Sequence, residues 1–145
     1  MRIAHALPVL VLIVAAPAQA QTQTVVYQGQ LTSEVTSGGT RPSRAPASLN
    51  RSGNDLVFER AICQEGTREV VGHESGTGRL EGGRFRIETE GSFGAQHAGR
   101  QTVRGHYEGT VTDAEVQIRG TRELVTQRPG IGMQSCTGTF RRQGG

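Results

Sequence analysis

The residues best suited to chemistry in this sequence are its two cysteines, Cys63 and Cys136. A catalytic redox pair usually has its thiols close in sequence, as in Cys-x-x-Cys, and a structural metal site needs further soft ligands. Neither arrangement occurs here. In an oxidising compartment two cysteines have one way to pair, and closing so long a loop would stabilise the fold by roughly 4 kcal/mol. We therefore expect one disulfide that staples the domain.

The other candidate groups form no catalytic or metal-binding pattern. His106 and Glu108 lie two residues apart, but a zinc site needs three or four converging ligands. No Gly-x-Ser-x-Gly segment or Ser–His–Asp order indicates a nucleophile, and a chain without lysine cannot contain a Gly-x-x-x-x-Gly-Lys phosphate loop. We assign no catalytic residue, no metal ligand and no cofactor.

The first residues, 1–20, have the three parts of a secretory signal peptide. Arg2 gives the basic start, residues 6–16 form an apolar run, and Ala18 and Ala20 provide the small residues of a cleavage site. The run is about half of the ~20 residues that a membrane-spanning helix needs. We expect export to the periplasm or beyond, with residues 21–145 as a single secreted domain and 143–145 as a frayed tail.

Charge and composition exclude several classes of protein. The chain has 16 basic residues, all of them arginine, against 13 acidic ones, for a net charge of +3. Acidic residues are interleaved with the arginines, so no basic stripe suits a nucleic acid. Only 34% of the residues are hydrophobic and 4% aromatic, too few to give a membrane barrel both its lipid-facing band and a filled interior. No span is expected in the mature chain.

Short segments of alternating polarity, separated by small and polar residues, predict an antiparallel all-β domain. The 21 glycines interrupt almost every helical window,. We predict a small antiparallel meander barrel or a strongly coiled sandwich of about eight strands. The expected strands are 24–33, 55–64, 68–73, 78–80, 84–91, 101–112, 115–127 and 134–142.

A short pattern recurs at 27–31, 107–111 and 136–140: a large residue, a glycine and a second large residue at alternate positions. Alternate residues of a strand share one face. An inward glycine between two bulky residues favours the sharp curvature of a small closed barrel.

Residues 37–54 break the alternation, being polar and rich in proline and arginine. Long segments of this kind are functional or disordered loops. We predict a long polar loop there, and take Arg41, Arg44 and Arg51 as candidate binding residues.

Two charged residues fall on positions that we expect to face inward. If Cys63 points inward, so does Glu59, and if Val116 and Ile118 point inward, so does Arg122. An isolated buried charge is very costly, so we hypothesise that Glu59 and Arg122 pair inside the barrel. A different strand register would remove this pair.

No motif identifies a partner, which stays unknown at this level. We expect a secreted, non-catalytic domain that binds another macromolecule, for instance a protein inhibitor of a periplasmic or extracellular hydrolase. The alternative is a small-molecule carrier that uses the barrel interior, although the aromatic residues common in pockets are scarce. A second alternative is a small periplasmic enzyme with an unrecognised site.

Overall fold

The computed structural model describes residues 23–36, 42–64, 67–95, 99–125 and 132–144, and these residues contain eight strands and no helix. The predicted signal peptide lies outside them. In this part of the chain no helix is long and apolar enough to cross a membrane. The strands are β1 (Thr24–Val35), β2 (Ser43–Ser52), β3 (Asp55–Cys63), β4 (Val70–Arg79), β5 (Arg84–Ala95), β6 (Gly99–Val111), β7 (Glu115–Val125) and β8 (Gln134–Arg142).

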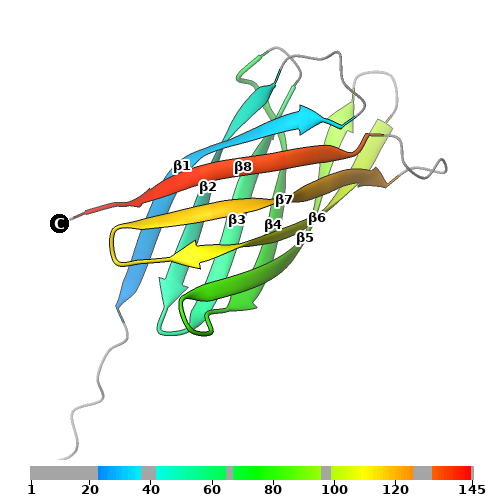
Figure 1. Ribbon diagram of the computed structural model, residues 1–145. Helices are drawn as coiled ribbons and strands as arrows, with labels where there is room; N and C mark the ends of the chain where they lie inside the picture. The colour runs from blue at the N-terminus through cyan, green and yellow to red at the C-terminus, as the bar shows by residue number, and fades with distance from the viewer. Residues whose placement is uncertain (1–22, 37–41, 65–66, 96–98, 126–131, 145) are drawn as a thin grey trace, which may run out of the picture.

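The strands form one closed antiparallel barrel in which each strand pairs with the next along the chain (Figure 1). Pairing of β1 with β8, from Tyr27↔Arg142 to Val35↔Gln134, completes the ring. The prediction of an all-β fold is confirmed, and of the two architectures that we considered the structure has the barrel. Closure leaves no strand with an unpaired edge, which removes the main aggregation hazard of a sheet protein.

Two predictions about individual strands are wrong. Residues 43–52, inside the predicted 37–54 loop, form β2 and pair with β1 along its length. The inward residues of β2 are the buried Ala45, Ala47 and Leu49, and two of these are too small to give a clear hydrophobic signal. The expected strands 68–73 and 78–80 belong to one strand, β4, whose glycines made it look interrupted.

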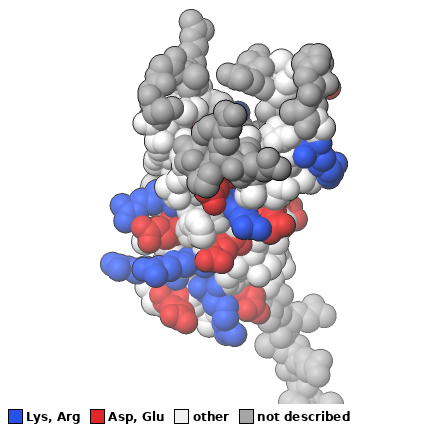
Figure 2. Space-filling view, turned by 90° about the vertical axis from the view of Figure 1, so that its right-hand side faces the viewer, with Lys and Arg blue, Asp and Glu red and all other residues white. Residues whose placement is uncertain are grey.

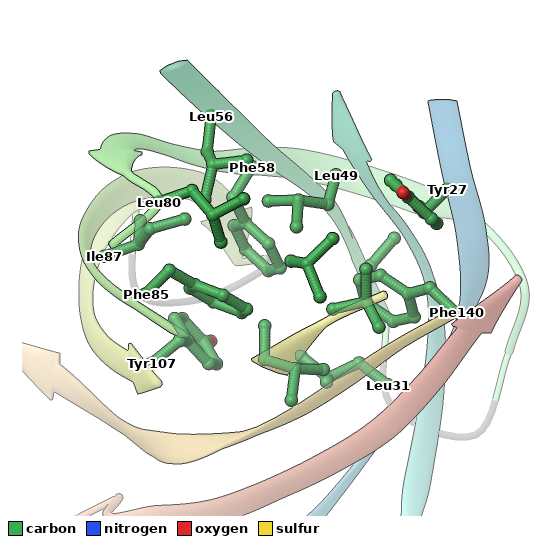
Figure 3. Close-up of a cluster of buried hydrophobic side chains, with 14 of the residues drawn as sticks. Tyr27, Leu31, Leu49, Leu56, Phe58, Leu80, Phe85, Ile87, Tyr107 and Phe140 are labelled. Atoms are coloured by element: carbon green, nitrogen blue, oxygen red, sulfur yellow. The ribbon is translucent and has the colours of Figure 1, made fainter. Parts of the chain in front are cut away.

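The apolar core fills the end of the barrel where β1 begins and β8 finishes (Figure 3). The Tyr27 hydroxyl donates a hydrogen bond of 2.8 Å to the Thr112 carbonyl and so helps to close this end. Burying aliphatic and aromatic side chains is the main favourable term in folding. The buried members include Tyr27, Leu31, Leu49, Leu56, Phe58, Leu80, Phe85, Ile87, Tyr107, Val111, Val116, Ile118 and Phe140.

The glycines of the recurring pattern leave space for large side chains from neighbouring strands. A Cβ atom added at Gly29 would lie 2.7 Å from Phe140 Cδ1, and one added at Gly109 would lie 2.8 Å from Phe85 Cζ. Both glycines therefore face the interior, as the sequence predicted, and aromatic rings cover them. Gly94 differs, because a Cβ there would meet no atom within 4 Å.

This contrast gives a matched pair of glycine substitutions. Gly109→Ala should lower the free energy of unfolding by about 1–3 kcal/mol, because the added methyl group overpacks the core. Gly94→Ala should change it by less than about 1 kcal/mol, and in the stabilising direction. Urea denaturation of both variants measures the difference. Equal effects would contradict the packing described here.

The predicted disulfide is absent, and this corrects the sequence analysis. Cys63 and Cys136 are both free thiols. Cys136 points into the barrel, with its Sγ 3.2 Å from Ser33 Oγ. Cys63 lies next to a register shift at Ile62/Cys63, at the end of β3. The fold is held by barrel closure and core packing rather than by a staple.

The free thiols can be counted directly. Unreduced protein should react with two equivalents of an alkylating reagent in denaturant, and intact mass spectrometry would show both additions. In native buffer Cys63, which is half-buried, should react before Cys136, which is fully buried, because reactivity follows exposure. A mass two hydrogens lower, with no alkylation, would show that the two cysteines form a disulfide and would contradict the free thiols described here.

Candidate functional site

Midway along the barrel, polar side chains replace the apolar ones in the interior. We call this group the polar layer: Ser33, Arg60, Glu74, Thr89, Tyr107, Arg122 and Cys136. Arg60 continues the inward face of β3 after Leu56 and Phe58, and Glu74 has the same position on β4. Buried polar groups need partners, so the contacts within the layer decide what it can do.

The carboxylate of Glu74 is the centre of the layer and is completely buried. Its Oε1 accepts hydrogen bonds from Thr89 Oγ1 at 2.5 Å and from the Tyr107 hydroxyl at 2.8 Å. Its Oε2 lies 3.3 Å from Arg122 Nη1, in an ion pair whose arginine side chain is 12% exposed. Arg122 also donates from Nε to Gln134 Oε1 at 3.0 Å. Both oxygens of Glu74 are therefore satisfied.

Two glycines make room for this carboxylate. A Cβ atom added at Gly105 would lie 2.5 Å from Glu74 Oε1 and 2.5 Å from Tyr107 Cε2. One added at Gly91 would lie 2.9 Å from the Glu74 Cβ. The buried charge thus occupies space that exists only because the facing strands carry glycine there.

Tyr107 joins the apolar core to the polar layer. Its ring stacks on Phe58 with a centroid distance of 4.8 Å, while its hydroxyl donates to Glu74 and accepts a 3.4 Å hydrogen bond from Arg60 Nη1. Burial, followed by the neighbouring Glu74 carboxylate, raises the pKa of Tyr107 well above its usual range. The phenol therefore stays protonated and acts as a fixed donor.

Arg60, unlike Glu74 and Arg122, has no oppositely charged partner in the polar layer. It is 2% exposed, and its Nη2 donates to Ser33 Oγ at 2.6 Å while its Nη1 lies 3.6 Å from Cys136 Sγ. Its Nε is buried with no partner. In the described ranges no carboxylate lies within ion-pair distance of Arg60. A buried guanidinium that contacts only neutral groups is costly.

The charge on Arg60 is nevertheless retained. Burial alone lowers the pKa of Arg60, but nearby Tyr107, Cys136 and Glu74 act in the opposite direction and the net pKa is raised. An arginine is effectively always protonated in proteins. Glu74 is already paired with Arg122, so the layer holds one positive charge in excess.

Above the polar layer, toward the ends of β1, β3, β5 and β7, lies a cavity of about 1130 Å³ that we call the cup. Arg60, Ser33 and Arg122 lie at its floor, where the polar layer begins. Pockets that bind small molecules combine mostly apolar walls with a few fixed polar groups. The cup is more mixed, because its lining also includes polar residues such as Arg44, Gln64, Glu69 and Gln134. Its apolar wall residues include Val35, Ala45, Ile62, Val71, Phe93, Val103 and Leu124.

The hypothesised pair of Glu59 and Arg122 does not form. Arg122 points inward, as expected, but its partner is Glu74. Glu59 is exposed on the outer face, and its neighbour Arg60 takes the interior position. The error came from taking Cys63 as an inward residue, whereas the alternation of β3 buries Leu56, Phe58, Arg60 and Ile62 and so turns Glu59 outward,.

Of the three arginines in the predicted binding loop, the two that the structure describes lie on a strand and not on a loop. Arg44 lies on β2 and borders the cup with an exposed side chain. Arg51, also on β2, donates from Nε to the Gly53 carbonyl at 2.9 Å. Arg41 lies outside the described residues.

Sequence reasoning missed Arg60 and Glu74. The signal for Arg60 was present, since Leu56, Phe58 and Ile62 share its alternation and are more hydrophobic than the intervening residues. Glu74 gave no such signal, because its inward neighbours on β4 are glycines and the strand has no hydrophobic face.

The outer face of the barrel carries interleaved acidic and basic side chains (Figure 2). Arg119 Nη2 lies 2.9 Å from Glu108 Oε1, and Arg86 lies on the other side of the same carboxylate at 4.0 Å. These residues border an outer hollow of about 1160 Å³. Exposed pairs of this kind add little stability, and the arginines of these pairs extend into solvent on the outer face. We place the candidate site in the cup, because its lining includes the buried Arg60 and Ser33.

Comparison with known proteins adds no assignment. The chain matches no protein-family model, and no curated protein or solved structure is significantly similar to it. Among the described residues no three His, Cys, Asp or Glu side chains converge to hold a metal ion. The site is therefore interpreted from its own geometry.

The Glu74–Arg122 pair should contribute strongly to stability. Glu74→Gln removes the only carboxylate of the polar layer and leaves two buried guanidinium groups without one, which should destabilise the fold by about 3–5 kcal/mol. Glu88→Gln is the matched control, since its side chain is 85% exposed and its ion pair with His106 lies on the outer face. Guanidinium denaturation should show a change below about 0.5 kcal/mol there. A similarly small loss for Glu74→Gln would contradict this role.

Proposed function

We propose that the protein is a non-catalytic carrier that holds one small molecule, with an apolar body, in the cup. The observation that carries this proposal is the division of the interior. Side chains fill one end of the barrel completely, while the other end keeps a cavity of about 1130 Å³. The interior of an eight-stranded barrel is just wide enough to be filled by side chains or to hold one small ligand. In this barrel one end is filled by side chains, and we propose that the other end holds the ligand.

The size and the walls of the cup support a single small ligand. Binding pockets typically span about 300–1,000 Å³, and the cup, at about 1130 Å³, lies slightly above that range. Its apolar wall residues are mainly aliphatic, with Phe93 as the aromatic residue among them. Such walls favour flexible aliphatic molecules over ligands that need stacking.

The alternatives have less support from the geometry. A macromolecular partner remains a prediction, but its basis was a long exposed loop, and residues 43–52 are a barrel strand. An enzyme needs a nucleophile beside a base, whereas the one buried carboxylate of the polar layer is already committed to three donors. If the predicted export occurs, the carrier would act in the periplasm or outside the cell.

A neutral fluorescent probe tests the cup. N-phenyl-1-naphthylamine carries no charge at neutral pH, and its fluorescence rises in an apolar site. It should bind the native protein with one-to-one stoichiometry. Ala45→Trp, which adds a large group to the cup wall, should weaken binding at least tenfold. Ala114→Trp is the control, because Ala114 is exposed in the turn after β6 at the opposite end of the barrel.

Two results would count against the carrier. One is that the native protein, with its fold verified by circular dichroism, shows no saturable binding of the naphthylamine probe. The other is equal binding by the Ala45→Trp and Ala114→Trp variants, which would place the probe elsewhere on the molecule.

A further inference from the structure

We infer that the ligand carries a single negative charge, a carboxylate, and that this group docks on Arg60 at the floor of the cup. The inference rests on the proposed function and names the chemistry of its ligand. The observation that motivates it is independent of the cup's size. In the described part of the chain, Arg60 is a buried cation with neutral partners only and an unsatisfied Nε.

The excess charge of the polar layer sets the charge of the ligand. Glu74 and Arg122 cancel each other at 3.3 Å, and Arg60 remains. One negative charge brought to the floor would neutralise the layer, whereas a neutral ligand would leave Arg60 desolvated and unpaired. A dianion such as a phosphate monoester would leave the layer with one negative charge in excess.

The chemistry of the floor favours a carboxylate. A guanidinium presents planar N–H donors that match the two oxygens of a carboxylate. Ser33 lies beside Arg60 at the floor and can offer its hydroxyl to the same group. The Arg60–Ser33 contact can be exchanged without leaving either group alone, because the Ser33 hydroxyl also contacts Cys136 Sγ at 3.2 Å.

The position of Arg60 also orients the ligand. The floor is polar, and aliphatic residues line the cup together with polar ones such as Arg44, Gln64 and Glu69. An acid with an alkyl chain would place its carboxylate on Arg60 and its chain along Val103, Ile62 and Leu124. The ligand class is therefore an alkyl carboxylic acid.

Arg60→Met is the decisive variant because it should fold. Methionine keeps a similar unbranched apolar stem, and each partner of Arg60 retains another contact: Tyr107 with Glu74, and Ser33 with Cys136. Removal of an unpaired buried charge should leave the thermal midpoint unchanged or higher. Arg84→Met, on the exposed outer face of β5, is the matched control.

Titration calorimetry at neutral pH with decanoate and with decan-1-ol tests the inference. The native protein and Arg84→Met should bind decanoate at least tenfold more tightly than decan-1-ol, as expected for a charge-assisted hydrogen bond. Arg60→Met should lose this preference by weakening decanoate at least tenfold, with decan-1-ol binding changed by less than about threefold.

The outcomes separate the two proposals. Equal binding of acid and alcohol by the native protein, or a decanoate preference that survives Arg60→Met, would overturn the anion site. Binding of the neutral naphthylamine probe without binding of decanoate would also overturn it and leave the cup as a carrier site. Binding of none of the three compounds would overturn both.

Discussion

Burial of the Glu74 carboxylate is the constraint on which the rest of the interior depends. A completely buried anion is tolerated when both of its oxygens are paired, and here Thr89, Tyr107 and Arg122 supply the donors. The facing glycine at position 105 is needed for the same reason, since any side chain there would occupy the place of the carboxylate. One acidic residue thus determines the residue types on several other strands.

The same group divides the barrel into two functional halves. Below it, Tyr107 turns its ring toward Phe58 and the core is closed. Above it, the described residues leave a cavity. The hydrogen bonds around Glu74 stabilise a unique arrangement, whereas Arg60, the excess cation of the layer, borders the cavity in which we propose that a ligand binds. Under this proposal, stability and binding depend on opposite sides of one hydrogen-bonded network.

The sequence revealed the architecture better than the site. Alternation at residues 84–90 and the glycine patterns at 27–31 and 107–111 reported the local pleat and curvature, and these are short-range properties. The pairing of the cysteines and the partner of Arg122 are long-range properties that depend on strand phase across the barrel. The wrong phase assumed at Cys63 was enough to make Glu59 rather than Arg60 the expected inward residue of β3, because a shift of one position turns a strand over.

Strand β2 shows why composition misled the reading of residues 43–52. A half-buried strand needs only its inward positions to be apolar, and in a small barrel those positions must also be small where facing strands crowd them. Ala45 and Ala47 meet both requirements, while arginine and serine occupy the outward positions. Such a strand has the composition of a loop but packs as part of the barrel. One of these small residues, Ala45, borders the cup, while Ala47 belongs to the apolar core. A small inward residue that gave a weak hydrophobic signal in the sequence thus also makes space for the proposed ligand.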